Sequence, residues 1–339
     1  MHGNLGHAAP AIRQLGGAAM LIASMLAAAA SAHAGDDPRS RLARIHAAAQ
    51  ERNYQGTMVF SARGMVSSSR VAHFSVGDQT YERIEALDGR QQKIYRHNEA
   101  VHTLWPQSSV MVVEKREAMG ARALLLQTVE PTASEQYELR TEGRERVAGR
   151  DAEVFLLFPR DAWRYAQRLW VDQASGLMLR ADVLGADRNV LESSAFSQIE
   201  IGIKPQPESV MQALRNVAGY KVLRAQHERA QIEAEGWTLK EALPGFALVS
   251  CVKRPIEATV AEDNRPSAQM LQTVFSDGLT HLSLFIERFD TARHRKEVQA
   301  QLGATATLMQ RRGDYWLIAM GDVPPATLKL LLDSLERRR

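Results

Sequence analysis

Between residues 53 and 203 the chain reads as a series of short strands separated by turn-forming residues. Apolar and polar side chains alternate within most of these segments, as in strands with one buried face. Asp88-Gly89 lies between two such segments and is a strong hairpin signal, and Gly77-Asp78 divides another pair. Strands recurring about every 8–12 residues predict an antiparallel meander rolled into a barrel or a sandwich. The predicted strands cover residues 54–61, 68–76, 80–87, 92–96, 101–104, 110–115, 137–147, 152–158, 168–172, 177–184 and 190–203.

The hairpin at residues 159–184 has the clearest pattern. An Arg164-Tyr165 pair precedes the strand 168–172, and a Gln-Ala-Ser-Gly turn at 173–176 leads into the strand 177–184. Glycine at the end of that turn supplies the positive φ that such turns use. A helix is expected ahead of the whole series at 39–52, because Leu42, Ile45 and Ala49 fall on one helical face. The segment 116–129 is predicted to be helical or irregular.

A second, smaller unit follows the strand series. Pro205 and Pro207 mark the end of the first, and the charged, aromatic-poor segment 204–235 is predicted to be a linker with one or two helices. Strands are expected at 247–253, 270–275, 279–287, 305–310 and 315–320, with a final helix starting near Pro324-Pro325. The predicted domains are therefore a large β domain at 35–203 and a small α+β domain at 236–339.

The N-terminus has the features of a secretory signal peptide. Arg13 is the one charged residue of the first 34, residues 18–30 are almost wholly apolar, and Ala32-His33-Ala34 forms a small-x-small cleavage pattern. The apolar run is shorter than the roughly 20 residues of a spanning helix. Cleavage is expected after Ala34, with 1–34 removed and the mature protein in the periplasm.

Composition limits the functional classes. Basic and acidic side chains nearly balance in each predicted domain, so a nucleic-acid partner is not expected despite the overall pI of about 9.0. Two local basic groups, 293–296 and 337–339, are either a solvated loop and a frayed helix end or a contact with lipid phosphates or an acidic partner. The single cysteine, Cys251, excludes an internal disulfide; it is either a buried apolar residue or a reactive or intermolecular thiol.

Catalytic and cofactor signatures are absent from the sequence. It has no nucleophile elbow, zinc-protease motif, Cys-x-x-Cys pair, P-loop or dinucleotide fingerprint. His97 and His102 would face opposite sides of a regular strand, as would Glu82 and Glu85, so neither pair suggests a shared metal or paired carboxylates. The expectation is a binding protein with no cofactor, not an enzyme.

Several short motifs resemble those of the periplasmic sigma-E factor regulators, the RseB/MucB family. Each motif is short, but they run in the family's order through both predicted domains. They comprise Tyr54-x-Gly56, Glu82-Arg83-Ile84 with Leu87-Asp88-Gly89, the run 146–150, the run 159–179, Pro244-Gly245-Phe246, Ser276-Asp277-Gly278-Leu279, the run 283–287 and Gly321-Asp322-Val323-Pro324.

The resemblance implies both a fold and a role. The large domain would be an open antiparallel half-barrel wrapped over helices, similar to the lipoprotein carriers, and the small domain would follow a flexible linker. The family binds the periplasmic domain of a membrane anti-sigma factor and shields it from proteolysis. Release would follow envelope stress, with lipopolysaccharide or mislocalised lipoprotein as proposed ligands. The alternative is a periplasmic lipid or lipoprotein carrier or chaperone, and self-association into a homo-oligomer stays open.

Large amphipathic side chains and arginines are the candidate contacts for a partner or lipid, because Trp, Tyr and Arg dominate binding hot spots. For Trp163 and Tyr165 core packing is an equal alternative, and Arg83 has the alternative of bridging neighbouring strands. Met65 and Ser67–Ser69 make the first hairpin look polar and loose, which puts a binding contact there in doubt. The candidates are Arg83, Trp105, Trp163, Arg164 and Tyr165.

Overall fold

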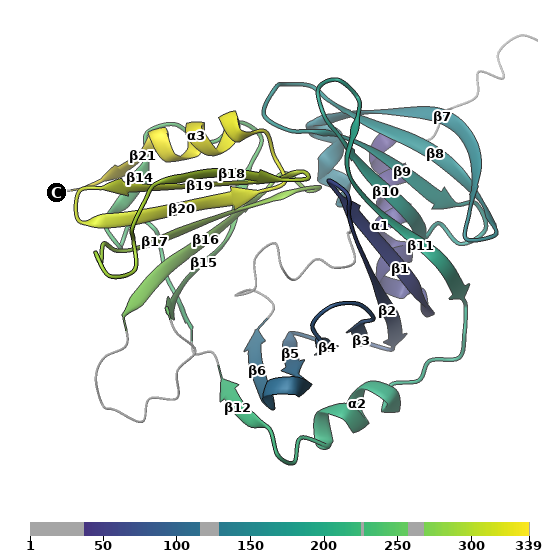
Figure 1. Ribbon diagram of the computed structural model, residues 1–339. Coiled ribbons are helices and arrows are strands. Elements are labelled where there is room, and N and C mark those ends of the chain that lie inside the picture. The colour runs from purple at the N-terminus through teal and green to yellow at the C-terminus, as the bar shows by residue number, and fades with distance from the viewer. Residues whose placement is uncertain (1–36, 116–128, 225–226, 257–267, 339) are drawn as a thin grey trace, which may run out of the picture. The chain divides into compact units, whose positions relative to one another are not determined.

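The computed structural model describes residues 37–115, 129–224, 227–256 and 268–338. The predicted signal peptide lies outside these ranges, as does almost all of the segment 116–129. The described residues form two lobes, each built on its own main sheet (Figure 1). No helix within those ranges is long and apolar enough to cross a membrane.

The large lobe is a single open sheet of twelve strands in the order β12-β6-β5-β4-β3-β2-β1-β11-β10-β9-β8-β7. Within the described residues β12 and β7 are its two edges and do not pair with each other, so the sheet is neither a closed barrel nor a sandwich. The open half-barrel implied by the family resemblance is confirmed. The strands are β1 (Tyr54–Ala62), β2 (Met65–Val76), β3 (Gln79–Ala86), β4 (Lys93–His97), β5 (Ala100–Trp105), β6 (Val110–Lys115), β7 (Tyr137–Val147), β8 (Arg150–Pro159), β9 (Ala166–Asp172), β10 (Met178–Leu184), β11 (Val190–Ile201) and β12 (Lys221–Arg224).

The edge strand β7 explains how the sheet can stay open. Most of its side chains are exposed and many are charged, and its pairing with β8 is interrupted by a bulge between Thr141 and Gly143. Charged side chains and bulges on an edge strand discourage further pairing. The sheet therefore ends there instead of closing.

The first hairpin is regular, contrary to the expectation from its polar sequence. β1 and β2 pair without interruption from Tyr54 opposite His73 to Ala62 opposite Met65. Arg63 and Gly64 form the two-residue turn with φ of 47° and 81°, as a primed hairpin turn requires. The backbone pairing of β1 with β2 therefore continues to the turn even though the residues near the turn are mostly polar.

Two helices pack on the large sheet. α1 (Pro38–Glu51) buries Leu42 and Ile45 in a cluster that includes Phe155 and Leu169. Fully burying one such side chain contributes roughly 1.5–3 kcal/mol. α2 (Glu208–Arg215) packs elsewhere, with Val210 in a separate cluster beside β4, β5 and β6.

The segment 204–235, predicted to be a linker with one or two helices, contains two short strands as well as α2. After α2 it forms β12, which pairs with β6 as the sheet's one parallel pair among the described strands. It then forms β13 (Glu228–Arg229), which pairs with β15 (Ala247–Pro255) of the other sheet. Consecutive short strands of this segment thus belong to different lobes.

The small lobe is α+β, as expected. Its seven-stranded sheet has the order β13-β15-β16-β17-β20-β19-β18, and α3 (Pro325–Ser334) packs on it through Leu328, Leu331 and Leu332. The sequence pattern missed four short strands of this lobe, β13, β14, β18 and β21. The remaining strands are β14 (Trp237–Leu239), β15 (Ala247–Pro255), β16 (Gln269–Ser276), β17 (His281–Arg288), β18 (Val298–Leu302), β19 (Thr305–Arg312), β20 (Tyr315–Gly321) and β21 (Leu335–Arg337).

Several residues of the two basic groups contact other side chains of the small lobe. Arg337 lies in β21, not in a frayed helix end, and its guanidinium is 4.9 Å from the Tyr315 ring centroid. Arg293 pairs with Glu287, and the His294 ring stacks on Trp316 at a centroid distance of 4.9 Å. Arg293, His294 and Arg337 therefore have partners within the chain.

Candidate binding site

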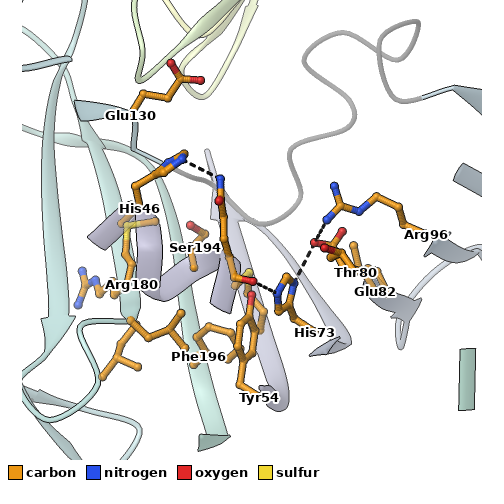
Figure 2. A pocket seen from close by; sticks show the side chains of 18 of the residues that line it. His46, Tyr54, His73, Thr80, Glu82, Arg96, Glu130, Arg180, Ser194 and Phe196 are labelled. Atoms are coloured by element: carbon orange, nitrogen blue, oxygen red, sulfur yellow. Dashed lines mark hydrogen bonds and ion pairs between the residues drawn. The ribbon is translucent and has the colours of Figure 1, made fainter. Parts of the chain in front are cut away.

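A pocket of about 710 Å³ opens on the large sheet beside α1 (Figure 2). Strands β1, β2, β3, β4, β10 and β11 supply much of its lining, and α1 contributes His46, Ala49 and Gln50. This volume falls in the range of small-molecule sites, which is roughly 300–1,000 Å³. The apolar part of the lining includes Tyr54, Met58, Ile84, Leu179 and Phe196.

A polar cluster forms one wall of the pocket. The buried His73 has Nδ1 3.0 Å from Oε1 of Glu82, and its Nε2 donates to the backbone oxygen of Gln50 at 3.0 Å. Arg96 donates to the same Glu82 oxygen at 2.6 Å. The ring of Tyr54 stacks on His73 with a centroid distance of 5.3 Å. One carboxylate thus joins three strands, because these residues come from β2, β3 and β4.

Burial has a large electrostatic effect on the pocket's tyrosine. It raises the pKa of Tyr54 far above the usual range, and the negative charge of Glu82 adds to that shift. Tyr54 is therefore a neutral ring over the whole physiological pH range. An uncharged ring at this position is compatible with an apolar ligand in the pocket.

Hydrogen bonds hold the two histidines of the pocket. Both ring nitrogens of His73 are engaged, and His46 donates from Nδ1 to the Val129 oxygen while its Nε2 accepts from Gln50. These contacts fix the orientation of both imidazole rings in the pocket wall. No group of three or more metal-ligating side chains occurs within the described ranges.

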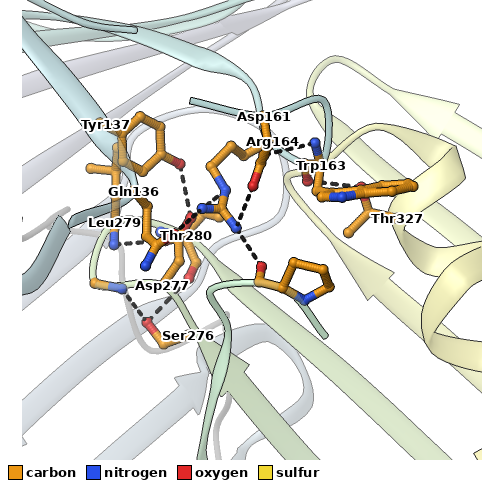
Figure 3. Close-up of polar contacts among 12 residues, drawn as sticks. Gln136, Tyr137, Asp161, Trp163, Arg164, Ser276, Asp277, Leu279, Thr280 and Thr327 are labelled. Carbon is orange, nitrogen blue, oxygen red and sulfur yellow. Dashed lines mark hydrogen bonds and ion pairs between the residues drawn. The ribbon is translucent and has the colours of Figure 1, made fainter. Parts of the chain in front are cut away.

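A second notable site lies where the loop between β8 and β9 meets the small lobe (Figure 3). Arg164 has a fully buried side chain whose Nε is 3.4 Å from Oδ2 of Asp277, in the turn between β16 and β17. It also donates to the Pro244 carbonyl at 2.6 Å and to Oε1 of Gln136 at 3.1 Å. The Tyr137 hydroxyl donates to Asp277 at 2.9 Å. Arg164 therefore connects the two lobes.

Burial dominates the electrostatics of this contact. It raises the pKa of Asp277, against hydrogen bonds from Thr280 and Leu279 and the charge of Arg164. Burial, reinforced by Asp277, also raises the pKa of Tyr137 well above its usual value. Arg164 supplies the positive charge that compensates the buried Asp277 carboxyl, and removing Arg164 would leave that carboxyl uncompensated.

The neighbouring residues of the same loop also contact the small lobe. The backbone oxygen of Trp163 accepts from Oγ1 of Thr327 on α3 at 2.8 Å. The hydroxyl of Tyr165 accepts from Nε2 of Gln301 on β18 at 3.1 Å. Three of the five predicted contact residues thus lie together in the junction between the lobes.

The other two candidates lie elsewhere on the large sheet. Arg83 is half-buried on β3 opposite Tyr95, and alternation puts it on the face away from Glu82 and the pocket. Its Nε has no hydrogen-bond partner in the described chain. Trp105 is half-buried at the end of β5. None of the five predicted residues lines the pocket.

Sequence reasoning did not identify the pocket residues as a site. Glu82, Arg96 and His73 come from different strands, and Gln50 comes from the preceding helix. The one available signal was His73, a histidine in the middle of an apolar strand.

Comparison with known proteins resolves the family. The MucB/RseB N-terminal domain model matches residues 37–214, which is more than half of the chain, and the MucB/RseB C-terminal domain model matches 231–336. The chain belongs to the MucB/RseB family. Its large lobe and its small lobe correspond to the family's two domains, in the same order.

Named MucB/RseB relatives match along nearly the whole chain. The sigma factor AlgU regulatory protein MucB of Pseudomonas aeruginosa is 28% identical over 322 residues, which is 93% of this chain and 95% of that protein. The sigma-E factor regulatory protein RseB of Escherichia coli K12 is 24% identical over 326 residues, covering 96% and 98%. A crystal structure of MucB in complex with MucA(peri) superposes with a TM-score of 0.64 at 25% identity and covers 89% of this chain and 100% of that one.

Proposed function

We propose that this protein is a periplasmic negative regulator of an envelope-stress sigma factor. It binds the periplasmic part of a membrane anti-sigma factor and shields it from proteolysis until a lipid or lipoprotein signal releases it. The observation that carries this function is the match of both MucB/RseB domains to one chain, supported by a relative solved with MucA(peri). The protein acts by binding, without catalysis.

Two surfaces are suited to the two kinds of ligand. The pocket, with its apolar lining and polar wall, fits an acyl chain whose head lies near Arg96 and His73, since each buried CH₂ contributes about 0.8 kcal/mol. The half-buried Trp105 and Arg83 are candidate contacts for the peptide. Trp163, Arg164 and Tyr165 would act indirectly, by holding the lobes in a binding arrangement.

Binding and protection are tested together. The mature protein, residues 35–339, is titrated by calorimetry with the periplasmic domain of the cognate anti-sigma factor, and degradation of that domain by its site-1 protease is followed with and without the regulator. Micromolar or tighter binding and slower cleavage are expected, both weakened by lipopolysaccharide. Absence of binding under every condition contradicts the proposal and leaves the lipid-carrier alternative.

A pocket variant separates the two ligands. Ser194→Trp places a large ring in the pocket and is expected to abolish the lipid effect while peptide binding persists; Ser197→Trp, on an exposed position of the same strand, is the control. If both variants respond to lipid as the unaltered protein does, the lipid binds elsewhere.

The secretory signal is part of the proposal. Residues 1–34 direct export and are removed after Ala34. N-terminal sequencing of protein recovered from the periplasm should read Gly35-Asp36-Asp37. An intact N-terminus in the cytoplasmic fraction contradicts it.

A further inference from the structure

The edge strand β18 of the small lobe lacks the features that usually prevent pairing with another chain. Among the described strands the sheet order ends at β18, which pairs with β19 without interruption from Val298 opposite Met309 to Leu302 opposite Thr305. The strand contains no charged residue and no proline, and Val298 and Leu302 are 37% and 52% exposed. Charges, prolines and bulges protect the edge strands of natural proteins. β7 of the large lobe has charges and a bulge, whereas β18 has neither.

The backbone of β18 offers hydrogen-bonding groups to a further strand. Leu302 and Thr305 close a two-residue turn, so they form a hydrogen-bonded pair, and hydrogen-bonded and non-hydrogen-bonded pairs alternate from there. Gln299 and Gln301 therefore have N–H and C=O groups that point away from β19. The Gln301 oxygen accordingly accepts from the Arg63 side chain at 3.3 Å. The backbone groups of Gln299 have no such contact among the described residues, so they are free to pair.

A groove of about 300 Å³ lies beside this edge, between the sheet and α3 (Figure 1). Leu308 of β19 and Gln299, its partner across the β18–β19 pair, line it on the side of the sheet. α3 contributes Ala326, Leu328 and Lys329. Side chains of a strand alternate between its two faces, so a strand added to β18 would direct every second side chain towards α3. The groove can therefore receive side chains of a strand that pairs with the edge.

Two cations without partners lie just before the strand. Arg295 and Lys296 are exposed, and neither has a hydrogen bond or an ion pair within the described part of the chain. The other two residues of the same basic group are engaged, because Arg293 and His294 both contact Glu287. Complementary charge helps a protein to select its partner. The basic group thus divides into two residues that contact the small lobe and two that are available to an acidic ligand.

We propose that β18 binds an extended, acidic segment of the anti-sigma factor's periplasmic domain by strand addition. The segment pairs with the outward-facing backbone groups of Gln299, directs alternate side chains into the groove beside α3, and places a carboxylate near Arg295 and Lys296. The edge selects an extended peptide, because only such a chain presents backbone donors and acceptors at the spacing of a strand. The identity of the partner rests on the proposed function.

Gln299→Pro tests the pairing directly. Proline removes an N–H group that faces away from β19, so β18 stays paired with β19 while an added strand loses its donor. The mature protein, residues 35–339, is titrated by calorimetry with the periplasmic domain of the cognate anti-sigma factor. Its affinity should fall on the order of tenfold or more. Gln299→Ala keeps the N–H group and is the matched control, which should bind within about threefold of the unaltered protein.

The groove and the cations are tested separately. Ala326→Trp fills the groove from an exposed position of α3 and should weaken binding as Gln299→Pro does, so it replaces the proline variant if that does not fold. Ala247→Trp, at an exposed position of β15 near the opposite edge of the sheet, is its control. The double variant Arg295→Glu with Lys296→Glu should weaken binding and remove most of its dependence on salt, because salt screens exposed charges.

Methylation of the peptide backbone identifies the mode of binding. Synthetic peptides that tile the periplasmic domain locate the bound segment, and its amide nitrogens are then methylated at either the odd or the even residues. One series should abolish binding and the other should not, because the N–H groups of a strand alternate in direction. Equal effects of the two series contradict strand addition.

The outcomes separate this site from the proposed function. If the unaltered protein binds the domain and both Gln299→Pro and Ala326→Trp bind it equally well, the site is wrong and the proposed function stands. If the unaltered protein does not bind the domain at all, both are wrong. If Gln299→Pro instead dissociates a dimer of this chain and leaves the affinity for the domain unchanged, the edge pairs two copies of the protein and the proposal is overturned.

Discussion

Replacing Arg164 by alanine should destabilise the protein strongly and uncouple the unfolding of its two lobes. The side chains of Arg164 and Asp277 are both fully buried, and the pair crosses from one lobe to the other. Alanine would leave Asp277 buried with the hydroxyl of Tyr137 and backbone donors but without its cation. The Pro244 carbonyl would also lose its donor.

The expected cost follows from the geometry. Unit charges 3.4 Å apart attract by about 5 kcal/mol at an effective dielectric constant of about 20, and desolvation of both ions offsets much of that gain. Removing one partner of such a pair costs about 3–5 kcal/mol, because the remaining charge is uncompensated. Arg140, paired with Glu138 on the surface at 2.8 Å, is the matched control, and its replacement by alanine should have a much smaller effect because solvent screens an exposed ion pair.

Urea unfolding followed by hydrogen exchange measures both effects, since exchange reports the stability of each lobe separately. Arg164→Ala should separate two transitions that coincide in the unaltered protein. The double variant Arg164→Met with Asp277→Asn should recover part of the loss, because it leaves no uncompensated charge. If Arg164→Ala costs no more than Arg140→Ala, the buried pair does not connect the lobes energetically.

Three further predictions concern single positions. Gly56→Ala should destabilise the large lobe by several kcal/mol in thermal unfolding, because its Cβ would lie 2.2 Å from the Gln198 backbone oxygen; an unchanged Tm would contradict this. Burial raises the pKa of Asp172, but the hydrogen bonds to its carboxylate, above all that from Arg150, outweigh burial and lower the pKa below its usual value. The ionised carboxylate therefore stabilises the folded protein above the ordinary carboxyl range, and this stability is lost as pH falls through the pKa of Asp172 in the folded state. Asp172→Asn should therefore flatten the acid limb of a pH–stability curve, and an unaltered limb would exclude this carboxyl as a contributor. Burial raises the pKa of Cys251 to about 11, so alkylation at pH 8 should be much slower than for free cysteine and should reach that rate only after unfolding.

The strands of the large lobe could be predicted because their signal is local. Alternation and turn residues are sufficient to locate β1 to β11 within a few residues, and Asp88-Gly89 and Gly176 mark turns between them. The short strands β12, β13 and β18 were missed because two to five residues carry no measurable periodicity. Whether the sheet closes into a barrel depends on whether its two edge strands pair with each other, and the alternation of apolar and polar residues does not predict that pairing.

The site residues were harder to predict, since their role depends on partners far away in sequence. Arg164 looks like a surface contact in a Trp-Arg-Tyr run, and only the fold brings Asp277 and Pro244 to it.

The two short strands of the connecting segment set a mechanical limit on how the lobes can move. β12 ends at Arg224 in one sheet and β13 begins at Glu228 in the other, so four peptide steps join them. A fully extended chain of that length spans about 14 Å. As long as both strands stay paired, their adjoining ends cannot separate further, and any opening must be a rotation about this tether. The contact of Arg164 with Asp277 then holds the two lobes together, and breaking it would widen the angle between them without letting them diffuse apart.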